Sequence, residues 1–138
     1  MEFYEYFIPM NNVKLENISY ESIPQVNTLN GQVKMNCKDT IVAQLKERGA
    51  KINFNRKVEF EPETAFSVSV TYSVFLPFRE EKKDEIDFKA VDLAGEFRRA
   101  GGPVLTKLMS KTSLMIAEIT DAADQNPLIT PPAPQKQI

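Results

Sequence analysis

The segment that most constrains the fold is AFSVSVTYSVF, residues 65–75, in which apolar and small polar side chains alternate without a break. One phase contains Phe66, Val68, Val70, Tyr72 and Val74, and the other contains Ser67, Ser69, Thr71 and Ser73. Successive side chains of a strand point to opposite faces, so this pattern predicts a strand with one buried and one solvated face. A one-faced strand requires a second layer to cover its apolar side.

Two further segments show strand periodicity. Residues 12–20, NVKLENISY, begin in one phase at Val13 and Leu15 and continue in the other at Ile18 and Tyr20. The phase changes at Glu16-Asn17, which predicts a β-bulge or a sharp bend, because one extra residue moves all later side chains to the opposite face. Residues 50–60, AKINFNRKVEF, predict another strand from the alternation of Ile52, Phe54, Val58 and Phe60.

The segment between these strands contains a turn signal and an ambiguous stretch. Asn30-Gly31 stands between apolar alternations and predicts a hairpin turn, because both residues tolerate positive φ. KDTIVAQLKERGA, residues 38–50, favours a short helix with Asp39 as its cap and Gly49 as its terminator. A continued strand is the alternative. Cys37 lies in an alternating stretch and is expected to be a small buried side chain.

A charged segment, REEKKDE at residues 79–85, predicts a solvated turn or loop. Its paired carboxylates have no neighbour that would raise a pKa, as acid–base catalysis requires. IDFKAV, residues 86–91, predicts a further short strand.

The periodicity becomes helical after Asp92. DLAGEFRRA, residues 92–100, predicts a short helix that Gly101-Gly102-Pro103 interrupts. A long amphipathic helix follows, which we expect Asn126-Pro127 to end. Its predicted apolar face contains Leu105, Leu108, Met109, Thr112, Met115, Ile116 and Ile119.

The chain ends in a proline-rich arm, residues 127–138. We expect Leu128-Ile129 to fold back onto apolar surface while the later prolines hold the chain extended. Strands first and helices last predict an α+β fold with helices packed on one face of an antiparallel sheet, and a length of 138 residues suggests one domain.

Composition excludes several classes of function. The chain has no histidine and a single cysteine, so it contains no Ser-His or Cys-His pair, and we expect no structural zinc site and no cofactor. A net charge of −2 gives no basic excess for nucleic acid or an anionic membrane surface. Three features favour a cytoplasmic location. Cys37 has no partner for a disulfide, no apolar run is long enough to span a membrane, and the N-terminus lacks the basic start of a signal peptide. We therefore expect a binding protein rather than an enzyme.

Several motifs are similar to those of a known family. NISYESIP, residues 17–24, resembles the first strand of the SecB family of bacterial export chaperones, which reads Asp-Ile-Ser-Phe-Glu followed closely by proline. Ile18, Ser19 and Glu21 match that motif, whereas Asn17 and Tyr20 replace its aspartate and phenylalanine. KINFN and AFSVSVTYSVF resemble later strands of the family, and the long helix followed by NPLITPP resembles its C-terminal part. The matches run in order through residues 12–132 and identify a divergent SecB-like chain.

The resemblance implies a four-stranded antiparallel sheet with two C-terminal helices packed on one face, in a single domain over residues 1–138. It implies an ATP-independent chaperone, or holdase, that binds unfolded or export-destined polypeptides in apolar grooves and assembles as a homotetramer, a dimer of dimers. The segment 29–49 is longer than the family pattern and is a candidate insertion. The apolar residues expected to contact clients are Phe54, Phe60, Tyr72, Phe75, Leu76, Phe78, Met109 and Met115.

Two departures from the family concern its partner SecA, the export motor. Glu21 keeps one acidic residue of the first strand that contacts SecA in the family, but Asn17 replaces the other. The net charge of −2 is also weaker than the family's acidic surface. Both departures count against SecA as a partner. The alternative interpretation is a structural or adaptor protein of the same fold dedicated to one partner, such as an antitoxin or a phage protein.

Overall fold

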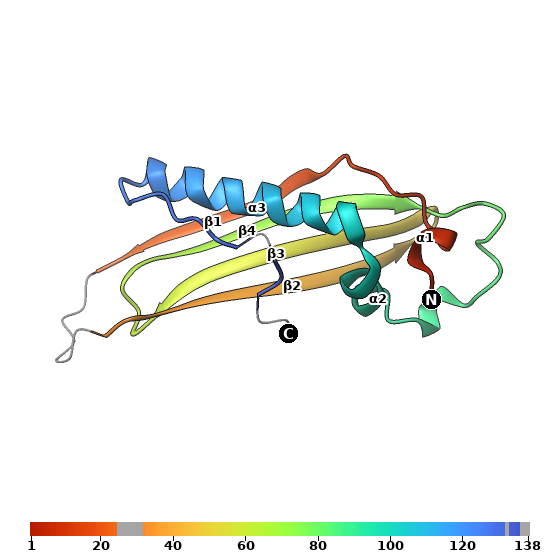
Figure 1. The fold of residues 1–138 in the computed structure, drawn as a ribbon, viewed down its shortest axis with the longest axis horizontal. Helices are drawn as coiled ribbons and strands as arrows, with labels where there is room; N and C mark the ends of the chain where they lie inside the picture. Colours follow the sequence, from red (N-terminus) through yellow and green to blue (C-terminus); the bar gives the residue numbers. More distant parts are fainter. Residues whose placement is uncertain (25–31, 132, 136–138) are drawn as a thin grey trace.

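The computed structural model describes residues 1–24, 32–131 and 133–135. The elements in chain order are α1 (Phe3–Tyr6), β1 (Lys14–Ile23), β2 (Lys34–Lys46), β3 (Gly49–Glu61), β4 (Ala65–Pro77), the 3-10 helix η1 (Phe88–Ala90), α2 (Leu93–Ala100) and α3 (Gly102–Ala122). Figure 1 shows a long twisted sheet with α3 lying along one face. The predicted α+β fold, an antiparallel sheet with C-terminal helices packed on it, is confirmed.

The sheet is antiparallel with the strand order β1-β4-β3-β2. The predicted strand at 65–75 is confirmed as β4, which lies between β1 and β3 and buries Phe66, Val68 and Val70. We call the face with these side chains the helix side, and the face with the serines of β4 the open side. The helix side forms the core because α3 covers β4 and the neighbouring part of β3.

The bulge predicted in the first strand is confirmed. The register between β1 and β4 shifts between Leu15 and Asn17, so Glu16 is the extra residue. Its carboxylate accepts a 2.8 Å hydrogen bond from Ser73 Oγ and lies 3.5 Å from Lys51 Nζ. The Ser73 hydrogen bond and the nearby lysine lower the pKa of Glu16. After the bulge, Ile18 and Tyr20 pair with Val70 and Val68 on the helix side.

The helix favoured for residues 38–50 is wrong, and the alternative of a continued strand is right. β2 runs through this segment and pairs with β3 from Lys34↔Glu61 to Lys46↔Gly49. Cross-strand pairing and the β-branched residues Thr40, Ile41 and Val42 outweigh the local helix signals. The Asn30-Gly31 turn lies outside the described residues, and the interpretation of 29–49 as an insertion stays a prediction.

The short strand predicted at 86–91 is also wrong. Residues 88–90 form η1, whose N-cap Asp87 accepts a 3.1 Å side-chain hydrogen bond from the Lys89 N–H. This local cap favours a helical turn over an extended chain. The turn carries Phe88 into the core, where its ring centroid lies 4.9 Å from that of Phe78.

The two helices predicted after Asp92 are confirmed, but the second ends earlier than expected. Asp92 caps α2 by accepting a hydrogen bond from the Gly95 N–H. α3 ends at Ala122 rather than at Asn126-Pro127, and Asp124 adopts a left-handed φ of 62°. The Leu128 N–H then donates to Thr120 Oγ1 at 2.9 Å, which directs the chain back along the helix. A left-handed residue stops a helix without proline.

The N-terminal segment is part of the core, which the sequence patterns did not reveal. Phe3 and Phe7 are buried and stacked on each other with ring centroids 4.6 Å apart. Phe7 also stacks on Phe78 at 5.3 Å, and Phe97 of α2 packs edge-on against Phe3 at 5.6 Å. Main-chain hydrogen bonds from Ile8 to Pro77 and from Arg79 to Tyr6 fix the segment beside the end of β4. It therefore closes one end of the core.

We expect Phe7→Ala to lower the free energy of unfolding by about 3–5 kcal/mol, because it leaves a cavity among the rings of Phe3, Phe78 and Phe88. Urea unfolding followed by circular dichroism measures the loss. The adjacent Ile8 is 37% exposed, so Ile8→Ala is the matched control and should cost under about 1 kcal/mol. Equal losses for the two variants would show that the N-terminal aromatics do not close the core.

Candidate functional site

A buried arginine lies at the centre of the helix side. Arg56 occupies β3 in the same phase as Phe54 and Val58, and none of its surface is exposed. Its Nε and Nη2 donate to the two carboxylate oxygens of Asp39, opposite it on β2, at 2.7 and 2.8 Å. The guanidinium carbon also lies 5.8 Å from the Phe54 ring centroid. A buried charge pair of this bidentate geometry fixes the register of β2 against β3.

The remaining donors of Arg56 point at α3 and at the C-terminal arm. Nη1 donates to Ser113 Oγ of α3 at 2.9 Å and to Thr130 Oγ1 at 3.0 Å. Nη1 and Nη2 donate further to the main-chain carbonyls of Pro131 and Ala133, at 2.6 and 3.0 Å. The arginine therefore joins the sheet, the long helix and the arm in one hydrogen-bond network.

Asp39 holds the arm at the outer edge of the sheet. Its Oδ2 accepts a 2.7 Å hydrogen bond from the Gln135 N–H, and its own N–H donates to the Gln135 carbonyl at 2.8 Å. Figure 1 shows the arm turning back from the end of α3 and crossing over β3 and β2. The predicted fold-back is thus confirmed for Leu128, which packs against the core, but it is wrong for Ile129, which is 77% exposed.

Apolar surface continues along β2 on both sides of the crossing arm. On one side, Met35 is 43% exposed and pairs with the half-buried Phe60, beside Cys37. On the other side, Ala43 and Leu45 line a pocket of about 330 Å³ with η1 and α2. We call this helix-side surface, from Met35 to Leu45, the β2 track. Burial raises the pKa of the Cys37 thiol, so the track carries a neutral thiol rather than a reactive thiolate.

The opposite flank of α3 leaves apolar residues of β1 uncovered. Leu15 and Ile18 are 38% and 43% exposed, and Tyr20 stacks on Phe66 with ring centroids 5.7 Å apart. Burial raises the pKa of the Tyr72 hydroxyl, and the negative charge of Glu118 on α3 adds to this shift. β1 is also an edge strand of the sheet.

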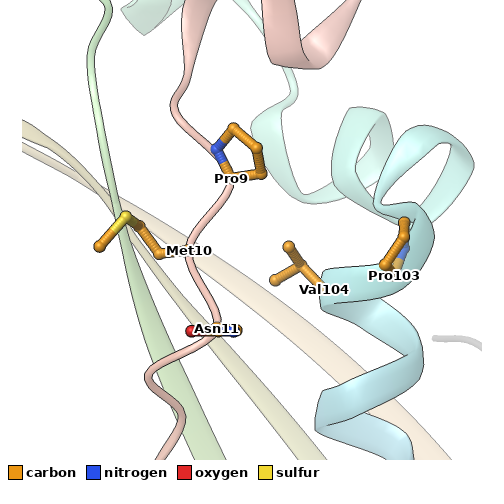
Figure 2. Close-up of a pocket in the computed structure, with 5 residues that line it drawn as sticks. All are labelled: Pro9, Met10, Asn11, Pro103 and Val104. Atoms are coloured by element: carbon orange, nitrogen blue, oxygen red, sulfur yellow. The ribbon is translucent and has the colours of Figure 1, made fainter.

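A further pocket of about 320 Å³ lies between residues 9–11 and the first turn of α3 (Figure 2). Pro9, Pro103 and Val104 give it an apolar rim, and the Lys107 ammonium donates to the Asn11 carbonyl nearby at 2.6 Å. The neighbouring Tyr4 hydroxyl donates to the Gly101 carbonyl at 2.6 Å, and burial raises its pKa to about 12. None of the described residues that line the pocket has a titratable side chain, so these residues offer apolar contact without visible chemistry.

The predicted client-contact residues are not gathered in one place. The structure puts Phe54, Tyr72, Leu76, Phe78 and Met109 in the core, with at most 8% of each exposed. Phe60 lies in the β2 track, Met115 is half-buried on α3, and Phe75 is 41% exposed on the open side. Of the eight residues, Phe60, Met115 and Phe75 therefore have surface available for a bound chain in this conformation.

The remaining predicted features lie on the surface. Glu21, the predicted SecA contact, is exposed on the open side, where it pairs with Ser67. The charged segment 79–85 forms a turn, as predicted, with an ion pair between Lys83 and Glu80. Within the described part of the chain, no helix is long and apolar enough to cross a membrane, and no cluster of three histidine, cysteine or acidic side chains could hold a metal.

The Arg56–Asp39 centre was missed by the sequence analysis. Its signal was present, because Arg56 falls in the apolar phase of Ile52, Phe54 and Val58. A cation in a buried phase requires an acidic partner, and Asp39 was interpreted as a helix cap instead.

We expect Arg56→Met to lower the free energy of unfolding by about 3–5 kcal/mol, because it leaves the Asp39 carboxylate buried without its cation. The double variant Arg56→Met/Asp39→Leu removes both charges and should be more stable than the single variant by at least about 1 kcal/mol. Urea unfolding of the wild type, Arg56→Met, Asp39→Leu and the double variant completes the double-mutant cycle. Additive losses would show that the two side chains are not coupled.

Comparisons with known proteins identify the fold. No protein-family model matches the chain, and no curated protein sequence matches it. Among solved structures, it is similar to a SecB-like chaperone of Mycobacterium tuberculosis, determined in complex with a ChAD peptide from the HigA1 antitoxin. The TM-score is 0.62 at 6% sequence identity, over 87% of this chain and 86% of that chain. The chain therefore has the SecB-like fold that its sequence motifs predicted, at a large sequence distance.

Proposed function

We propose that the chain is an ATP-independent chaperone that holds unfolded or export-destined polypeptides on the β2 track. The observation that carries this proposal is the uncovered apolar surface of the track, on a fold shared with a chaperone solved with a peptide bound. Holding an unfolded chain requires apolar burial rather than a nucleophile, a metal or a nucleotide. Met35 and Phe60 suit many client sequences, since methionine and aromatic side chains adapt to varied partners.

We expect Met35→Glu to weaken binding of an unfolded model polypeptide by about tenfold, because a client would have to desolvate the new carboxylate. Suppression of client aggregation and titration with a labelled unfolded chain measure the effect. The matched control is Val42→Glu, which places the same charge on the same strand but on the open side, at a residue 48% exposed. Equal effects of the two substitutions, or no binding by the wild type, would contradict the proposal.

A second candidate is an adaptor of the same fold that serves one dedicated partner. It is favoured by the M. tuberculosis chaperone, whose solved complex contains a peptide of an antitoxin. An adaptor binds one partner segment saturably and is indifferent to unrelated unfolded chains, whereas a holdase binds many. Glu21 is exposed, but Asn17 on the same strand lacks the second charge, so SecA docking forms no part of the proposal.

We propose in addition that two copies associate through β1, as the first step of the dimer of dimers that the SecB resemblance implies. β1 is an edge strand, and an uncovered edge is a template for pairing with another chain. Leu15 and Ile18 add exposed apolar surface beside that edge. This places self-association on one flank of α3 and client binding on the other.

We expect Ile18→Lys to raise the dissociation constant of the dimer by about tenfold, because the ammonium replaces an apolar contact. Light scattering over a range of protein concentrations measures the shift. Ser19→Lys is the matched control, since Ser19 pairs with Ser69 on the open side and should have a smaller effect. A wild type that stays monomeric at all concentrations would contradict the proposed association.

A further inference from the structure

We propose that the Arg56–Asp39 pair is a binding site for the main chain of an extended polypeptide. The C-terminal arm fills this site in the structure, and a bound client takes it over by displacing the arm. This inference rests on the proposed chaperone function, because it names how the β2 track engages a client. The occupant is an extended segment recognised through its carbonyl and N–H groups rather than through particular side chains.

The contacts to the arm are mostly of a kind that any residue can offer. Arg56 donates to the main-chain carbonyls of Pro131 and Ala133, and Asp39 exchanges two hydrogen bonds with the main chain of Gln135. The chain bends at Ala133, and the bend lies between the carbonyls that meet Arg56 and the main chain that meets Asp39. The Thr130 hydroxyl adds one side-chain contact to Arg56. The site therefore recognises main-chain groups with little dependence on sequence.

The arm is held weakly by apolar contacts. Ile129 is 77% exposed, and Pro131, Ala133 and Pro134 are exposed as well. Leu128 and Thr130 supply the buried surface of this segment. A segment held mainly by main-chain hydrogen bonds at one charged pair can be exchanged for another segment that makes the same bonds. A client with larger apolar side chains would gain additional contacts with Met35 and Phe60 on the track.

An empty site would cost free energy. We therefore expect a client chain to replace the arm rather than the arm to leave by itself. Without the arm, Arg56 would lose acceptors on both Nη groups and Asp39 would lose a donor. Unpaired buried polar groups are strongly disfavoured. Pro131 and Pro134 have fixed φ angles in the free arm, so the arm loses less conformational entropy when it returns. The arm therefore occupies the site until a client chain displaces it.

Amide hydrogen exchange on the full-length wild type tests the displacement directly. The probe is reduced, carboxymethylated α-lactalbumin, a permanently unfolded chain. We expect saturation with this chain to accelerate exchange at the Gln135 N–H, while the Asp39 N–H stays protected because a client carbonyl replaces that of Gln135. The Val68 amide in the sheet core is the internal control. Unchanged protection of Gln135 in the client-bound protein would overturn the inference.

A pair of full-length variants tests the same exchange through affinity. Gln135→Pro removes the N–H that donates to Asp39, whereas the control Gln135→Ala retains it. We expect Gln135→Pro to bind a synthetic peptide of residues 126–135 about tenfold more tightly than the control does, because its own arm competes less. The same peptide with an N-methylated glutamine should lose that gain. Thermal unfolding verifies that both variants remain folded.

The outcomes separate this inference from the proposed function. Client binding with unchanged Gln135 protection and equal peptide affinity in both variants would leave the chaperone proposal standing and remove the arm exchange. If neither the unfolded chain nor the peptide bound, the chaperone proposal and the arm exchange would both be contradicted. Tighter peptide binding by Gln135→Pro without binding of unfolded chains would support the site and favour the dedicated adaptor over the general holdase.

Discussion

The bidentate pair between Arg56 and Asp39 is the interaction on which the rest of the structure depends. It pairs an edge strand with its neighbour, and it connects both strands to α3 through Ser113 and to the arm through Pro131, Ala133 and Gln135. A buried ion pair contributes little net stability against an apolar substitute, but it allows few arrangements of its neighbours. Its main effect is therefore to specify one register and one path of the chain across the sheet.

Helix α3 divides the helix side of the sheet into a covered middle and two flanks with exposed apolar side chains. α3 covers the middle, β1 leaves apolar side chains on one flank, and the β2 track leaves them on the other. An edge strand with apolar neighbours suits association with a second copy, whereas a longer track with a polar centre suits an extended chain. The same core thus supports two surfaces, separated by a single helix.

Local patterns predicted much of the fold and little of the site. The alternation at 66–74 and the phase change at Glu16 were sufficient for β4 and for the bulge of β1. The patterns failed where tertiary contacts decide, as in β2, where pairing with β3 outweighs helix signals, and at Phe3 and Phe7, whose burial depends on Phe78 and Phe97. Most of the predicted client residues are core residues, because periodicity identifies an apolar phase but not which part of it is covered.

The sequence by itself determined the α+β fold class, the likeness to SecB and the absence of histidine chemistry. Periodicity suffices for the fold class and composition for the lack of histidine, whereas the likeness to SecB came from the resemblance of short motifs. Only the tertiary structure decided that Arg56 meets Asp39 and that the proline-rich arm returns to them across the sheet. These residues lie far apart in the chain. Their meeting depends on the strand register, the end of α3 and the packing of the sheet, which no local pattern specifies.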